Sequence, residues 1–338
     1  MSTLLEARYR AVLRLLPAYY RREREEEMVE TYLWDVDRET QEQSRPTLGE
    51  VASVLALAVR SRLGAGAAPR RYAVLGSAVR LFALFAVLLQ AASAVVDRVL
   101  GLTWASTRGG SQWEMFTDGF TGHGVWSGVG AVAQWFLPLL WTVAYFALLR
   151  DHRRLAQVSA LVAALPTLWP LADLLALDFA PSDSAYVGAA AVLAWSSAVA
   201  LCAAHHRDAP PATLPAGAPG LVFAACCVLM GGSVVALPGG VDTVWALITG
   251  YLVTSLAWLV YRLRGGSRAP APGEAAALAA LGLLLLAVRV TAVYPWLDML
   301  PGALRVGVLA QAAALVALTA ALAVVSGRDL LGRVSRGT

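Results

Sequence analysis

Residues 74–96, VLGSAVRLFALFAVLLQAASAVV, decide the fold of this chain. The stretch is apolar except for Arg80, Gln90 and two serines, and a helix of about 20 such residues crosses the hydrocarbon core of a bilayer. Further apolar stretches of similar length follow it along the chain. We place these at residues 128–149, 155–176, 186–205, 220–237, 243–262, 275–295 and 303–326. The sequence therefore predicts an all-α integral membrane bundle of about eight transmembrane helices.

The composition supports a membrane protein. Hydrophobic residues make up 58% of the 338 residues and charged residues only 15%, whereas soluble domains carry roughly 25% charged residues. A soluble globule of this length could not keep so much apolar surface away from water. The composition therefore excludes a soluble protein.

Several kinds of catalytic and metal site are absent from the sequence. All 27 basic residues are arginines, so a phosphate-binding loop that ends in Gly-Lys is missing and a fused ATPase is not expected. The three cysteines have no CxxC spacing, the histidines form no HExxH pattern, and no GxSxG turn occurs. We predict that the protein is not an enzyme and binds no metal or cofactor. The arginines are expected to set membrane topology rather than to bind nucleic acid.

The N-terminal part of the chain is polar and is predicted to form a small helical domain. Residues 1–71 hold 12 arginines and 11 acidic residues. Apolar spacing predicts helices over residues 4–16 and 18–43. A third helix is expected to begin at Thr47, because Thr47 and Glu50 form a capping box, and to end at Gly64. The predicted organisation is a cytoplasmic three-helix domain over 1–66, a membrane domain over 72–327 and a short cytoplasmic tail over 328–338.

A run of charged side chains marks the second of these helices. It contains Arg21, Arg24, Glu25, Glu26 and Glu27. Charges at this spacing form i,i+4 pairs on a solvated helix face. The alternative interpretation is a docking surface for a partner.

The order of these features resembles a known family. The matching segments are 15–21 (LLPAYYR), 25–28 (EEEM), 46–51 (PTLGEV) and 59–64 (VRSRLG). They resemble the HAAS-type, or permease-prefix, helical domain that begins many actinobacterial and Firmicutes membrane proteins, over about 65 of the 338 residues. The resemblance implies an association with PadR-type transcription regulators, or a position ahead of a transporter permease. It implies no catalytic residue.

Arginine placement predicts the orientation in the membrane. Arginines precede the first predicted span and follow the second, fourth, sixth and eighth, whereas the alternate loops carry mainly acidic residues. Because positively charged loops stay in the cytoplasm, both termini are predicted to be cytoplasmic in a bacterial plasma membrane.

A charged residue inside a predicted span is costly and usually faces the protein interior. Asp173 in the third span and Arg289 in the seventh have similar predicted depths, near the outer surface, and could form a pair. The pair would either line a ligand-binding cavity that opens outward or fix helix packing. Arg305 and Asp298 are candidates for the same cluster. Gln90 is expected to bond a neighbouring helix rather than a substrate.

The segment from Asp97 to Ser127 is predicted to be the longest outer loop. Its aromatic and charged residues include Trp113 and Glu114, which are candidate ligand-binding residues. Long ordered loops are often functional, so one hypothesis is a sensing or lid element. The other is a loop held at the membrane surface by interfacial aromatic residues.

These features favour a membrane-anchored sensory or regulatory protein. Its N-terminal domain would bind a cytoplasmic partner such as a PadR-like regulator, and its membrane domain would lie in the lipid bilayer and respond to an envelope signal. The alternative is a permease-type transporter component that works with a separately encoded ABC-type ATPase. A third reading is a structural membrane scaffold.

Overall fold

The structure is a computed structural model, and it describes residues 4–34, 45–64, 68–121, 125–176, 181–206, 209–212, 214, 218–237, 242, 244–264 and 273–334. These residues form helices and turns, with no strand among them. The helices are α1 (Leu4–Leu13), α2 (Ala18–Trp34), α3 (Leu48–Arg62), α4 (Arg70–Thr107), α5 (Gly110–Thr121), α6 (Val125–Phe136), η1 (Leu137–Leu139), α7 (Leu140–Leu149), α8 (Arg153–Ala164), η2 (Leu165–Thr167), α9 (Leu168–Ala176), α10 (Pro181–Ala204), α11 (Pro219–Ala236), α12 (Trp245–Leu263), α13 (Glu274–Val293), η3 (Tyr294–Trp296) and α14 (Gly302–Val334).

Eight helical segments in the described part are long and apolar enough to cross a membrane. This finding confirms the predicted all-α architecture, with eight candidate membrane-spanning helices among the described residues. The segments are Arg70–Thr107, Gly128–Leu149, Arg153–Ala172, Ser184–Ala204, Pro219–Ala236, Trp245–Leu263, Glu274–Trp296 and Gly302–Arg328. The second and third each contain a 3₁₀ turn, at Pro138 and Pro166. Proline lacks the N–H that would continue the α-helical bonding, which accounts for both interruptions.

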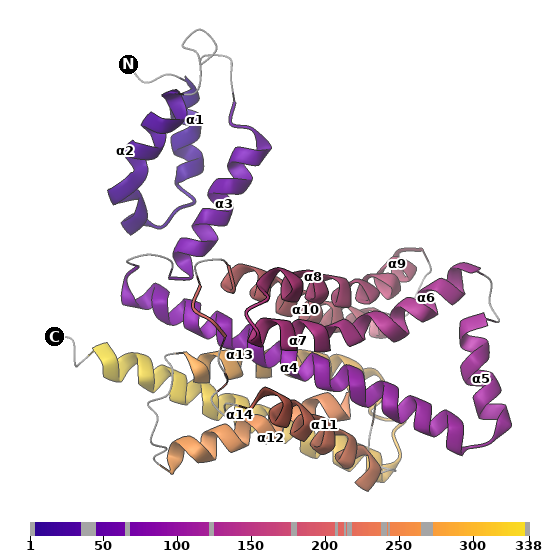
Figure 1. The fold of residues 1–338 in the computed structure, drawn as a ribbon. Helices are drawn as coiled ribbons and strands as arrows, with labels where there is room; N and C mark the ends of the chain where they lie inside the picture. The colour runs from indigo at the N-terminus through magenta and orange to yellow at the C-terminus, as the bar shows by residue number, and fades with distance from the viewer. Residues whose placement is uncertain are drawn as a thin grey trace.

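Helix α4 runs through the centre of the bundle (Figure 1). It packs against α7, α10, α11, α12 and α13. Its buried side chains belong to two hydrophobic clusters: Val87 and Leu88 lie in one, and Ala86 and Leu89 lie in the other. Its 38 residues extend about 57 Å at 1.5 Å per residue, well beyond the roughly 30 Å hydrocarbon core of a bilayer.

The predicted outer loop over residues 97–127 is largely helical, which corrects the sequence interpretation. Helix α4 continues to Thr107, and α5 follows after a turn at Gly109, whose φ of +98° suits glycine. Helix α5 lies across the end of the bundle opposite α1–α3 (Figure 1). Its aromatic side chains Phe116 and Phe120 contact the ring of Trp135, with ring centroids 5.1 and 6.0 Å apart.

Helices α1, α2 and α3 pack around a small apolar cluster at the other end of the bundle (Figure 1). Leu13, Val29 and Ala58 are buried in it, one from each helix. The ring of Tyr9 stacks on that of Tyr32 with centroids 4.0 Å apart. The first helix is shorter than expected, since α1 ends at Leu13. The second is described to Trp34, and its predicted continuation over 35–43 lies outside the described residues.

The predicted boundaries of α3 are confirmed. The Thr47 hydroxyl accepts a hydrogen bond from the Glu50 N–H at 3.3 Å, and the Glu50 carboxylate accepts one from the Thr47 N–H at 2.6 Å. At the other end Gly64 adopts a φ of +83°, and its N–H donates to the Ser61 carbonyl at 3.3 Å. These are the capping box and glycine C-terminal cap expected from the sequence.

The end of α3 is in tight contact with the start of α4. A Cβ atom on Gly76 would lie 1.9 Å from the Leu63 carbonyl oxygen, so only glycine fits this approach. Beside it, the Tyr19 hydroxyl donates to the Ser61 carbonyl at 2.8 Å. The Tyr19 ring also lies 5.2 Å from that of Tyr72 on α4. The start of α4 is therefore in contact with both α3 and α2.

The charge run on α2 forms both a local pair and pairs with α1. Arg24 lies 3.5 Å from Glu27, an i,i+3 pair on the exposed surface. Arg10 of α1 binds Glu26 at 2.8 Å and lies 3.7 Å from Glu25. The run therefore holds α1 against α2, in addition to presenting a charged face. A docking role for Arg21, Arg24 and the three glutamates stays a prediction.

Candidate functional site

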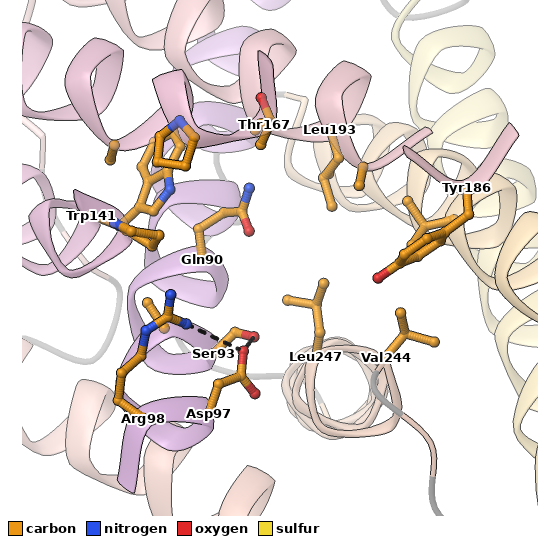
Figure 2. Close-up of a pocket in the computed structure, with 17 residues that line it drawn as sticks. Gln90, Ser93, Asp97, Arg98, Trp141, Thr167, Tyr186, Leu193, Val244 and Leu247 are labelled. Atoms are coloured by element: carbon orange, nitrogen blue, oxygen red, sulfur yellow. Dashed lines mark hydrogen bonds and ion pairs between the residues drawn. The ribbon is translucent and has the colours of Figure 1, made fainter. Parts of the chain in front are cut away.

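A polar cavity of about 200 Å³ lies inside the bundle, in the half nearer α5. Helices α4, η1, α7, α8, η2, α10, α12 and α13 all contribute to its walls (Figure 2). Its polar side chains include Gln90, Ser93, Asp97, Arg98, Thr167 and Tyr186. The rest of the lining is mainly apolar, and a pocket with a few convergent polar groups is typical of a small-molecule site.

Helix α4 supplies the charged side of this cavity. Gln90, Ser93 and Asp97 follow i, i+3, i+7 spacing, which places them on one helix face. The Ser93 hydroxyl donates to Asp97 Oδ2 at 3.2 Å. Figure 2 shows the Gln90 amide and the Asp97 carboxylate directed into the cavity. The apolar length of α4 and this polar face together build the site.

Arg98 is held from the other side by α6. Its Nε donates to the Trp135 carbonyl at 2.9 Å and its Nη2 donates to the Gln134 carbonyl at 2.6 Å. Its guanidinium also lies over the Trp135 ring, 5.5 Å from the centroid, in a cation–π arrangement. Its Nη1 lies 4.0 Å from Asp97 Oδ2, which is too long for a hydrogen bond.

Two further polar groups of the cavity lack a protein partner. Within the described part of the chain, neither the Gln90 amide nor the Trp141 indole N–H makes a hydrogen bond, although Trp141 is 3% exposed. The expectation that Gln90 bonds a neighbouring helix is therefore wrong for the described residues. Its amide instead faces the cavity. Both groups are available to a molecule inside it.

Arg289 of α13 is buried beside this cavity, and its ion-pair partner is Asp242. Its Nη1 lies 2.5 Å from Asp242 Oδ2, and the arginine is 1% exposed. Asp242 also accepts a hydrogen bond from the Val244 N–H, just before α12. Val244 and Val288 line the cavity, so the pair supports its wall. Nε and Nη2 of Arg289 have no hydrogen-bond partner among the described residues.

The other predicted site residues are dispersed. Asp173 belongs to α9, but its side chain lies outside the described residues, so its pairing with Arg289 stays a prediction. Arg305 and Asp298 lie 3.8 Å apart on the exposed surface. Trp113 and Glu114 of α5 are also exposed and do not line the described cavity. The sequence interpretation missed Asp97 and Arg98 because it ended the first helix at Val96.

One titratable side chain is buried at the other end of the bundle. His205 follows α10 and is 3% exposed. Burial, together with the nearby positive charges of Arg80 and Arg153, lowers the pKa of His205 to about 4.

This burial predicts a loss of stability at acid pH. The pKa of an unfolded histidine is near 6.5, so the unfolded chain takes up a proton first as pH falls. Stability should therefore be unaffected by His205 above pH 6.5 and should decrease between pH 6.5 and about 4, by up to about 3 kcal/mol. Thermal denaturation across this range would measure the loss. His205→Gln should flatten the profile and His152→Gln, at an exposed position, should not; equal slopes in all three proteins would contradict the assignment.

No group of three or more His, Cys, Asp or Glu side chains in the described ranges is placed to hold a metal ion. No protein-family model matches the chain, and no similarity was found to a curated protein or to a solved structure.

Proposed function

We propose that this chain is a membrane-anchored sensory or regulatory protein of a bacterial plasma membrane. Residues 1–66 act as a cytoplasmic domain, 72–327 as the membrane domain and 328–338 as a cytoplasmic tail. In this orientation the cavity lies toward the outer surface and α5 lies at the outer interface. An envelope signal acts at the cavity, and the N-terminal helices carry the response to a cytoplasmic partner.

The observation that carries the proposal is the continuity of α4. Its first turns contact the end of α3 through Gly76 and contact Tyr19 of α2 through Tyr72. About 30–40 Å further along the same helix, Asp97 and Arg98 line the polar cavity. A long helix with few breaks transmits a rotation or shift from one end to the other, so a ligand at the cavity would reach the N-terminal helices without a flexible connection.

Transmission requires that the ligand favour one of two positions of α4. The contact between the end of α3 and the start of α4 supports such a mechanism because the two backbones approach closely. The backbone of Gly76 approaches the Leu63 carbonyl so closely that a Cβ atom would not fit between them. A displaced α4 must therefore carry α3 with it or break the contact, and either change alters what the N-terminal helices present.

The partner surface proposed for these helices is the charged face of α2, and the favoured partner is a PadR-like transcription regulator. Arg24 and Glu27 are 56% and 64% exposed there and pair with each other rather than with the core. Charged side chains at the rim of an interface steer association and set specificity. Because Arg24 and Glu27 pair with each other, exchanging the two residues reverses the charges on this surface and keeps the local ion pair.

Exchanging these two charges is expected to weaken partner binding. In affinity purification from native membranes, the Arg24→Glu/Glu27→Arg protein should recover about tenfold less regulator than the wild type, because reversed charges oppose the partner's own. Deletion of residues 1–66 should abolish recovery. Arg305→Gln, at an exposed position on the far side of the bundle, is the matched control.

The proteins recovered decide between the candidate functions. A DNA-binding regulator that is lost on deletion supports signalling. An ATPase that copurifies with the full chain would instead favour the permease component. Identical partners for the full chain and for the chain lacking residues 1–66 would contradict a docking role for the N-terminal helices.

A further inference from the structure

The cavity presents two opposite charges that do not neutralise each other through a hydrogen bond. Asp97 Oδ2 and Arg98 Nη1 are 4.0 Å apart. Asp97 receives one hydrogen bond, from Ser93, and its side chain is 46% exposed. The carboxylate therefore keeps acceptor capacity for a donor that enters the cavity, since an ionised carboxylate offers about four acceptor sites.

Arg98 is fixed in place but keeps its charge. The two groups that it bonds through Nε and Nη2 are backbone carbonyls, which are neutral. Its ring contact with Trp135 orients the guanidinium plane further. Nη1 is thus a positioned cationic donor at the cavity wall, and a guanidinium held in this way is well suited to bind a carboxylate or phosphate oxygen.

A ligand of one sign would meet one favourable and one unfavourable charge here. A cation at Asp97 would lie within a few ångströms of Arg98, and an anion at Arg98 would lie as close to Asp97. A molecule with both charges satisfies the two residues together. At this separation a ligand of one sign is repelled by the residue of like charge, which selects for a dipolar ligand.

The remaining lining agrees with a small dipolar molecule. The Gln90 amide offers a donor and an acceptor and the Trp141 indole N–H a donor, and both lack a protein partner within the described residues. A cavity of about 150 Å³ can hold a benzene-sized molecule. The volume of about 200 Å³ found here is therefore sufficient for a compact molecule that is slightly larger.

We propose that this cavity binds a small zwitterion, with a primary ammonium group on Asp97 and a carboxylate or phosphate group on Arg98. This inference rests on the cavity being the signal site of the proposed function. The same chemistry occurs in a free amino-acid-type solute and in the ethanolamine headgroup of a phospholipid. Either source places the ammonium against Asp97 and the anionic oxygen against Nη1.

The first experiment compares the binding of zwitterionic and singly charged probes to the wild-type protein. Full-length protein in phosphatidylglycerol nanodiscs is titrated with glycine, O-phosphoethanolamine, ethylammonium and acetate, and binding is measured by calorimetry. At least one zwitterion should bind roughly tenfold more tightly than either singly charged probe. The proposal would be overturned if ethylammonium bound as tightly as the zwitterions. It would also be overturned if no zwitterion bound and the protein retained no phosphatidylethanolamine.

A second arm separates the two sources. Nanodiscs that contain phosphatidylethanolamine are compared by native mass spectrometry for lipid that stays bound after detergent transfer. Retained phosphatidylethanolamine that O-phosphoethanolamine displaces indicates a headgroup. Soluble binding without retained lipid indicates a free solute. Both outcomes support the zwitterion site.

Variants locate the site. Asp97→Asn should reduce zwitterion affinity roughly tenfold, and Gln90→Leu should reduce it less. Asp118→Asn on α5, at an exposed position, should leave it unchanged. If Asp97→Asn binds like the wild type, the assignment is wrong. These measurements need no cytoplasmic partner, so failure here and failure of the copurification experiment are distinguishable.

Discussion

Replacing Asp242 by asparagine is expected to lower the free energy of unfolding by about 3–5 kcal/mol. Arg289 is 1% exposed, and Asp242 is its ion-pair partner among the described residues. Removing one member of a buried pair leaves an uncompensated charge, which costs more than the pair itself contributes. Asp242 also accepts a hydrogen bond from the Val244 N–H, just before α12. Denaturation of the purified protein in mixed detergent micelles would measure the change.

The double variant Asp242→Asn/Arg289→Met should recover most of this loss, because apolar replacement of a buried pair is often neutral. Arg305→Gln is the control, since Arg305 and Asp298 form an exposed pair worth less than about 1 kcal/mol. Asp173→Asn belongs in the same series. A cost as large as that of Asp242→Asn would support its predicted pairing with Arg289. An unaffected Asp242→Asn protein would show that the buried pair does not stabilise the fold.

Substituting Gly76 by valine is expected to separate α3 from α4. The added Cβ would lie 1.9 Å from the Leu63 carbonyl oxygen, a backbone atom that cannot move without displacing α3. Overpacking of this kind costs about 1–3 kcal/mol or more. Limited proteolysis within residues 64–70 should become faster, while the eight spans stay assembled.

Gly232→Ala is the matched control, because a Cβ at this helical glycine meets no atom within 4 Å. It should be neutral or slightly stabilising, since alanine favours helix more than glycine does. Unchanged cleavage in the Gly76→Val protein would mean that α3 is not held against α4 in the membrane.

Apolar length predicted the eight spans well, because burial in lipid requires about 20 consecutive apolar residues. The same signal failed at the end of the first helix. Asp97 and Arg98 interrupt the apolar run after Val96, and a helix that extends past the bilayer has no need of apolar length. Beyond Val96 the helix instead contacts α6, for example through the hydrogen bond from Arg98 to the Trp135 carbonyl. No local pattern encodes a contact between residues 37 positions apart.

The same reason limited the prediction of the site. Asp97 looked like the start of a loop, so its shared face with Gln90 and Ser93 became visible only when the helix was known to continue. Asp242 was one of several acidic residues in the loops that were predicted to face outward. The choice of Arg289 as its partner depends on how α12 and α13 approach each other, and hydropathy and charge placement do not report that geometry.

Hydrogen exchange of the full-length protein in nanodiscs tests the central claim, that α4 couples the cavity to the N-terminal helices. Wild type, Asp97→Asn and the control Asp118→Asn are compared at every peptide. Coupling predicts that Asp97→Asn changes exchange over residues 48–76, whose nearest residue lies about 30 Å along α4 from the substituted position, whereas the control does not. A change confined to the peptides that line the cavity would contradict it.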